Sequence, residues 1–110
     1  MNLINIIVKI NNPDAPYYYK GEAKEYKDII EYDYLNENVI FDKQMERVIK
    51  SNNNESVIVD FQKEEIVINS NKKELNIKIN VVKKEISENR FYYLYEFDKI
   101  KIEFIIEKEV

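Results

Sequence analysis

The clearest pattern of apolar and polar residues lies near the C-terminal end of the chain. Over residues 91–106, large apolar side chains occupy the odd positions up to Phe97 and the even positions from Ile100. Strict alternation is typical of a half-buried β-strand, and the change of parity indicates a two-residue turn at Asp98-Lys99. The pattern predicts a hairpin with these facing pairs: Phe97 with Ile100, Tyr95 with Ile102, Tyr93 with Phe104 and Phe91 with Ile106.

The same alternation continues through the rest of the chain and changes phase at each predicted junction. The predicted turns and loops are 27–28, 36–37, 42–44, 52–54, 63–64, 71–72 and 87–89, with a break at residues 11–16, where two prolines stop any ladder. An antiparallel ribbon of this length with one apolar face must curl or fold over to cover that face. We therefore predict one all-β domain over residues 1–110, an antiparallel up-and-down meander of about ten strands. It is expected to close into a calycin or lipocalin-like barrel, with a β-sandwich as the alternative.

Charge and composition narrow the classes of partner. The net charge is -4 and the pI is near 5.0, which argues against nonspecific binding to nucleic acid or to an anionic membrane. The chain has no cysteine and no apolar run long enough to span a bilayer. We expect a cytoplasmic protein with neither a nucleic-acid partner nor a membrane partner.

Several stretches carry a resemblance to a known family. They are INIIVKI near the N-terminus, YYYKGEAKEYKDIIEYDYL with Gly21, QMERVIKSNNNESVIVDF, KELNIKINVVKKEI, and the C-terminal RFYYLYEFDKIKIEFIIE. Their order resembles the YwiB-like family of uncharacterised bacterial proteins with a calycin-type β-barrel. The resemblance implies that fold and implies no activity.

The inventory of side chains argues against catalysis. There is no His, Cys or Thr, and all four serines fall in or beside predicted turns, so no Ser–His or Cys–His relay can form. Zinc sites built on His or Cys are excluded, and the carboxylate pairs of the predicted strands point outward into solvent. We expect no catalytic residue, no metal and no cofactor.

Tyrosines form the first candidate site. The predicted inward face carries Tyr17, Tyr19, Tyr32, Tyr34, Tyr93 and Tyr95, joined by Arg47. One interpretation is a lumen that holds a small apolar or aromatic ligand oriented by hydroxyl groups. The alternative is a filled core, and a one-residue register shift would turn Val48 inward and Arg47 outward.

The second candidate is the predicted outward face, which is acidic but carries apolar residues. These are Leu3, Ile7, Ile29, Ile40, Val48, Ile58, Val67, Val82, Tyr92, Leu94 and Ile105. If they cluster they would form a surface for a partner, including a second copy of the chain in a homodimer. The two functional hypotheses are thus a non-catalytic ligand-binding barrel and a protein-interaction or inhibitor module that uses this outer face.

Overall fold

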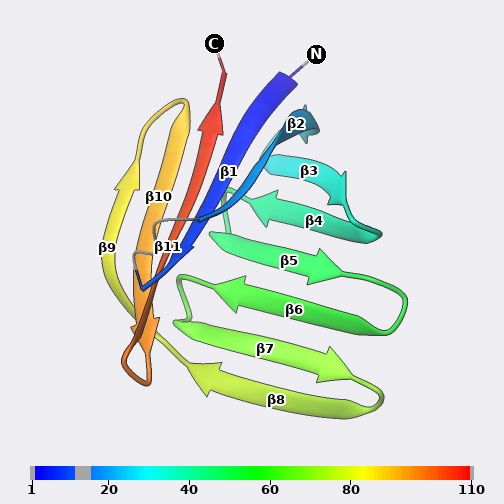
Figure 1. Ribbon diagram of the computed structural model, residues 1–110, viewed down its shortest axis with the longest axis vertical. Coiled ribbons are helices and arrows are strands. Elements are labelled where there is room, and N and C mark those ends of the chain that lie inside the picture. Colours follow the sequence, from blue (N-terminus) through cyan, green and yellow to red (C-terminus); the bar gives the residue numbers. More distant parts are fainter. Residues whose placement is uncertain (1, 12–15, 110) are drawn as a thin grey trace. The chain divides into compact units, whose positions relative to one another are not determined.

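A computed structural model describes residues 2–11 and 16–109, which are all strands, turns and short loops (Figure 1). The strands are β1 (Asn2–Ile10), β2 (Tyr17–Tyr26), β3 (Ile29–Tyr34), β4 (Glu37–Asp42), β5 (Arg47–Ser51), β6 (Glu55–Asp60), β7 (Glu65–Ser70), β8 (Lys73–Lys78), β9 (Asn80–Ile86), β10 (Arg90–Phe97) and β11 (Ile100–Lys108). Neighbouring strands with a defined register pair in antiparallel fashion. The sheet order is β8-β7-β6-β5-β4-β3-β2-β1-β11-β10-β9. The predicted all-β antiparallel up-and-down meander is confirmed, with eleven strands in place of about ten. In the described ranges, no helix has the length and apolar character needed to cross a membrane.

The chain forms two compact units. Unit 1 consists of Met1–Glu22 with Ile79–Val110, and unit 2 of Ala23–Lys78, so β2 contributes its first half to one and its second half to the other. Residues 12–15 of the predicted proline break lie outside the described residues.

Unit 1 is built around the hairpin that the sequence predicts most strongly. β10 and β11 pair with the four predicted residue pairs in register, from Phe97 opposite Ile100 to Phe91 opposite Ile106. Asp98 and Lys99 form the turn with φ of 46° and 66°, the left-handed geometry of a type I′ turn. β1 adds to the other side of β11, and the core-facing residues of these strands include Ile4, Ile6, Tyr93, Phe104 and Ile106.

Strand β9 completes unit 1 through a β-bulge. Near the loop that begins at Ser87, Ile86 faces Phe91, but beyond Leu94 the register shifts by one, so that Tyr95 faces Val81 as predicted. An extra residue in one strand flips the faces of the side chains that follow it.

The one glycine of the chain, Gly21, lies in β2 beneath the ring of Tyr19. A Cβ atom built on Gly21 would come within 2.5 Å of the Tyr19 Oη, so any larger residue would displace the ring. The Tyr19 hydroxyl donates to the Glu22 carbonyl oxygen at 3.4 Å. The absence of a side chain at Gly21 therefore allows the aromatic ring to pack along the strand.

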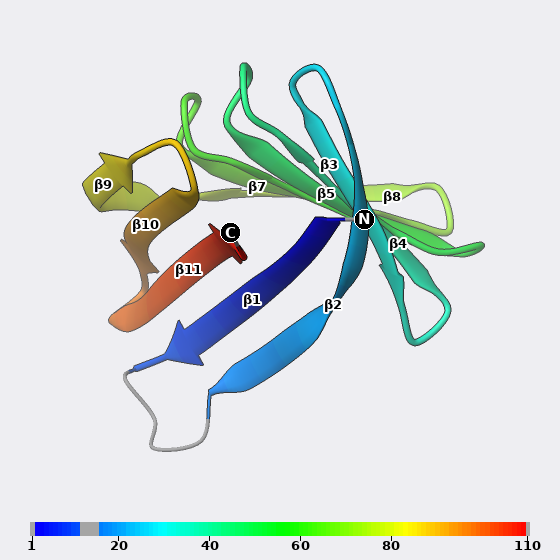
Figure 2. The same ribbon diagram turned by 90° about the horizontal axis from the view of Figure 1, so that it is seen from above.

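Unit 2 is an antiparallel ladder of β3 to β8 with the end of β2 beside β3, and its strands lie side by side in chain order in Figure 1. The fan that these strands make in Figure 2 reflects the twist usual for such a sheet. The face that carries the buried residues is called its core face; it includes Ile30, Tyr32, Val39, Phe41, Val48 and Ile66.

Two-residue turns were predicted with mixed success in unit 2. The turns at Lys27-Asp28 and Asn71-Lys72 are confirmed. The turn predicted at residues 36–37 is wrong by one position: it lies at Leu35-Asn36, with φ of 49° and 63°. Moving the turn by one shifts the pairing by two residues, so Tyr32 and not Tyr34 faces Val39, and both stay on the core face.

Three loops of unit 2 are longer than predicted because each begins with a side chain that caps its backbone. The Oδ1 atoms of Asp42, Asn52 and Asp60 each accept two backbone N–H groups, from the residues two and three positions later, at 2.8–3.1 Å. Such Asx turns stabilise four-residue loops without glycine. Counted between paired residues, the connections are 43–46, 52–55 and 61–64. The loop predicted at 42–44 and the two-residue turn predicted at 63–64 are therefore wrong. The loop predicted at 52–54 agrees with the strand bounds, but Ile49 faces Ile58 and not Val57 as predicted.

Because of these loop lengths, strand β5 faces the opposite way from the prediction. The loops on either side of β5 each have one residue more than predicted, so β5 presents the opposite face while β6 returns to the predicted one. Val48 is opposite Phe41 on the core face, Arg47 is opposite Asp42 on the other face, and Met45 is exposed in a loop. Of the two alternatives for Arg47, the register selects the one-residue shift.

Candidate functional site

The tyrosines predicted to line a lumen divide between the two units and differ in burial. In unit 1, Tyr93 is fully buried and Tyr95 is buried, whereas Tyr17 is 44% exposed at the start of β2. Burial raises the pKa of the Tyr95 hydroxyl to about 12. In unit 2, Tyr32 is buried and Tyr34 is half-buried. Tyr32, Tyr93 and Tyr95 are thus buried, whereas Tyr17 is exposed, and the assignment of these tyrosines to a ligand-binding lumen stays a prediction.

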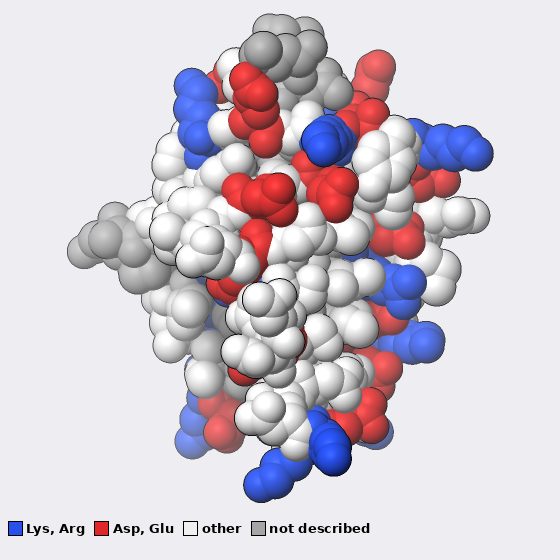
Figure 3. Space-filling view, turned by 90° about the vertical axis from the view of Figure 1, so that its right-hand side faces the viewer, with Lys and Arg blue, Asp and Glu red and all other residues white. Residues whose placement is uncertain are grey.

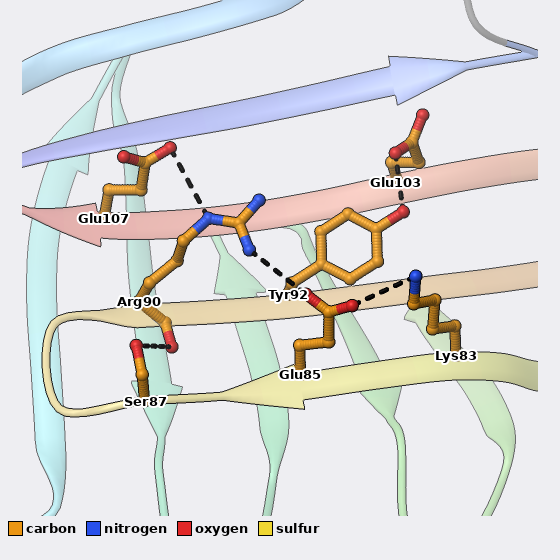
Figure 4. A network of polar contacts seen from close by, with 7 residues as sticks. All are labelled: Lys83, Glu85, Ser87, Arg90, Tyr92, Glu103 and Glu107. Carbon is orange, nitrogen blue, oxygen red and sulfur yellow. Dashed lines mark hydrogen bonds and ion pairs between the residues drawn. The ribbon is translucent and has the colours of Figure 1, made fainter.

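The face of unit 1 opposite its core carries a network of polar contacts on β9, β10 and β11 (Figure 4). Arg90 lies 3.7 Å from Glu85 and 3.8 Å from Glu107, and its guanidinium sits 5.2 Å from the centre of the Tyr92 ring. The Tyr92 hydroxyl donates to Glu103 at 2.6 Å. Burial, together with this bond, raises the pKa of Tyr92 to about 12. Beside Tyr92 in register lies Ile105, an outward residue that is only 5% exposed.

The face of unit 2 opposite its core face is organised differently, and we call it the stripe face. Its side chains form three rows that cross the ladder from strand to strand. The middle row contains an unbroken apolar stripe made of Ile40, Ile49, Ile58 and Val67, each directly opposite the next. One flanking row is uncharged from β4 to β7, with Asn38, Ser51, Ser56 and Asn69, and has Asp33 and Glu74 at its two ends; we call it the uncharged row. The other flanking row is charged, with Asp42, Arg47, Asp60 and Glu65.

The apolar stripe is a continuous surface. Four strands spaced about 4.8 Å apart give it a length of about 15 Å. All four side chains are half-buried. The described strands of unit 2 lie side by side in one sheet, so no strand of this unit crosses the stripe. Ile40, Ile58 and Val67 were predicted to face outward; Ile49 takes the place predicted for Val48.

The stripe follows from an internal repeat that alternation alone did not reveal. Residues 39–49 (VIFDKQMERVI) and 57–67 (VIVDFQKEEIV) match in pattern with a spacing of 18 residues. Each copy is a strand, an Asp-capped loop and the start of the next strand, so equivalent residues fall on the same row of the ladder. The two loops also join, since the Gln62 side chain donates to Glu46 at 3.0 Å and the Phe61 amide donates to the Glu46 carbonyl at 2.9 Å.

The uncharged row continues into the loops at one edge of the ladder. Two open hollows of about 420 Å³ and 410 Å³ lie there. Asparagine, serine and acidic residues line both of them, and the first is also lined by Lys72 and Lys73. Figure 3 faces the side on which these loops lie, and uncharged side chains, drawn in white, dominate the lower middle of that view. This edge therefore offers amide and hydroxyl groups and little net charge.

Overall the stripe face is acidic. Its three rows hold six carboxylates (Glu31, Asp33, Asp42, Asp60, Glu65 and Glu74) and three cations (Lys24, Arg47 and Lys78), a net charge of -3. Asn38 donates to both Glu31 and Asp33 at 3.0 Å, which holds two of these carboxylates in place. Arg47 lies between Asp42 and Asp60, and its buried Nε has no hydrogen-bond partner.

Neither a metal site nor a match to a known protein indicates the function of this chain. Among the residues that the structure describes, no group of three or more His, Cys, Asp or Glu is placed to hold a metal ion. The resemblance to the YwiB-like family stays a prediction, because neither a family model, nor a curated protein, nor a solved structure matches this chain.

Proposed function

We propose that the protein is a non-catalytic interaction module that binds a partner protein through the stripe face of unit 2. The observation that carries this proposal is the unbroken register of Ile40, Ile49, Ile58 and Val67 across four neighbouring strands. Aligned apolar residues on a face that no strand of the unit crosses are typical of protein–protein contact surfaces.

The charge of the face indicates the chemistry of the partner. Carboxylates outnumber cations by six to three in the rows around the stripe. A partner with an apolar centre and a basic rim would complement this face and would be steered toward it. A second copy of the chain would instead bring two acidic faces together, so it is the less favourable occupant.

The ligand-binding hypothesis has weaker support. Tyr93 and Tyr95 are buried, Tyr17 is exposed, and neither of the hollows described above includes any of the predicted tyrosines. A lumen ligand therefore stays a prediction without a described site.

A matched pair of cross-linkers tests where a partner binds. A photoreactive amino acid is placed at Ser56 on the stripe face or, as a control, at Ser87 in the loop that follows β9 of unit 1. In cells that make the protein, we expect a partner to be captured from Ser56 and not from Ser87. Capture from Ser87 alone, or from neither position, would contradict the proposal.

The captured partner is then purified and its affinity measured by isothermal titration. The double change Ile49→Thr with Ile58→Thr is expected to weaken binding by about tenfold or more, because it removes buried apolar area from the centre of the contact. The control Leu75→Thr alters an exposed apolar residue on the opposite face and should leave the affinity unchanged. Affinity should also fall between about 50 and about 300 mM salt. Equal affinities for the double variant and the wild type would rule the stripe out. A dimer that the double variant abolishes would show that the occupant is a second copy.

A further inference from the structure

Strand β8 has an open edge. It is the last strand of the ladder, and it pairs with β7 on one side, while no strand of the described chain pairs with its other side. Backbone N–H and C=O groups on such an edge are available to another strand. Five of its six residues are exposed.

The register identifies the backbone groups that face the open side. The two-residue turn at Asn71-Lys72 makes Ser70 and Lys73 a hydrogen-bonded pair. Because such pairs alternate along an antiparallel ladder, Lys73, Leu75 and Ile77 bond to β7. The N–H and C=O groups of Glu74, Asn76 and Lys78 therefore point to the open edge.

The charge of this edge is opposite to that of the protein. Lys72, Lys73 and Lys78 lie on or next to β8 with a single carboxylate, Glu74, in a chain whose net charge is -4. None of these three lysines forms an ion pair within the described residues. In contrast, Lys20, Lys43 and Lys50 lie within 2.9–3.2 Å of carboxylates. The hollow of about 420 Å³ is lined in part by Lys72 and Lys73 and leaves free space beside the start of the strand.

We propose that the β8 edge binds an extended acidic segment of a partner protein as an added strand. Main-chain hydrogen bonds to Glu74, Asn76 and Lys78 would give affinity, and the unpaired lysines would select acidic side chains. Pairing with β8 of a second copy would bring together two edges that each carry three lysines and one carboxylate, which is less favourable than pairing with an acidic segment. This site uses the backbone edge of β8. The Glu74 and Lys78 side chains lie in the outer rows of the stripe face, but the inference does not depend on the apolar stripe.

Two peptides and two variants test this inference. The probe is a fluorescent seven-residue peptide of alternating glutamate and valine, and the matched control peptide alternates lysine and valine. Fluorescence anisotropy at about 50 mM salt should show binding of the acidic peptide and at least about tenfold weaker binding of the basic one. Asn76→Pro removes the central free N–H without removing a β7–β8 hydrogen bond. This variant should therefore bind the acidic peptide at least about tenfold more weakly than the wild type does. Asn76→Ala keeps the N–H and should change the affinity by no more than about twofold.

Each other outcome has a defined meaning. The proposal is overturned if the acidic peptide does not bind. It is also overturned if the peptide binds the Asn76→Pro variant and the wild type equally, because binding by charge alone does not require backbone hydrogen bonds at the β8 edge. Self-association that Asn76→Pro abolishes in light scattering would also overturn it, since the occupant would be a second copy. If Asn76→Pro fails to fold, hydrogen exchange of the wild type decides: the peptide must protect the amides of Glu74, Asn76 and Lys78. The double variant with Ile49→Thr and Ile58→Thr should bind the peptide as the wild type does. The test of the β8 edge is therefore independent of the test of the stripe face.

Discussion

The stripe face of unit 2 and the corresponding face of unit 1 both carry apolar residues in register, but only in unit 2 does the central isoleucine stay partly exposed to solvent. In unit 1, Tyr92 and Ile7 flank Ile105, and Ile105 is 5% exposed. In unit 2, Ile49 has Ile40 and Ile58 as its neighbours, and all three stay half-buried.

The difference lies in the side chains around the apolar residues. In unit 1 the large side chain of Tyr92 lies beside Ile105, and contacts with Arg90 and Glu103 hold its ring in place. Unit 2 has short Asn and Ser side chains on one flank of the stripe. On its other flank, Asp42 and Asp60 are engaged with the amides of their own loops. An outward apolar residue thus becomes part of the core or part of a surface according to the length and freedom of its neighbours.

The largest effects are expected in the cores, where the two units should respond alike. Tyr93→Ala in unit 1 and Phe41→Ala in unit 2 each remove a side chain with no solvent exposure. Each should lower the free energy of unfolding by about 3–5 kcal/mol, because the cavity adds to the lost burial. Urea unfolding followed by circular dichroism measures this. Tyr17→Ala is the control and should cost less than about 1 kcal/mol, and a comparable loss there would contradict the assignment of the core.

A matched pair of isoleucines tests the contrast between the two faces directly. Ile105→Ala should destabilise the protein by about 2–4 kcal/mol, as expected for a buried isoleucine. Ile49→Ala, on the stripe, should cost about 1 kcal/mol, because that side chain is already partly in water. Chemical denaturation of both variants under one set of conditions makes the comparison. Equal losses would mean that the stripe is as well covered as Ile105 and would remove the basis of a binding surface.

The smallest effect concerns alkaline pH and arises in unit 1. Tyr92 and Tyr95 have pKa values raised to about 12, while an unfolded tyrosine titrates near pH 10. Between these values the unfolded chain binds fewer protons than the folded one, so the stabilisation is complete below about pH 10 and is lost as pH rises to about 12. Unfolding measured across this range, with tyrosinate absorbance, should show that decline. Tyr92→Phe and Tyr95→Phe should each make it shallower, and an unchanged slope in both would refute the assignment.

Much of the architecture could be predicted because β-strand alternation is a local property. The hairpin of residues 91–106 is correct pair by pair, since one parity change fixes one two-residue turn. The tyrosine site could not be established in the same way. Alternation places Tyr17 and Tyr93 on the same kind of face, but exposure depends on how far each lies from the end of its strand.

The sequence by itself determined that the chain is an antiparallel meander, and it determined the faces of most strands. Tertiary structure decided the face of β5, the union of Ile40, Ile49, Ile58 and Val67 into one stripe, and the open edge of β8. The physical reason is that one additional loop residue inverts a strand, and the lengths of these loops depend on side-chain caps from Asp42, Asn52 and Asp60. Contact between strands, and the lack of it at an edge, is a property of the assembled ladder.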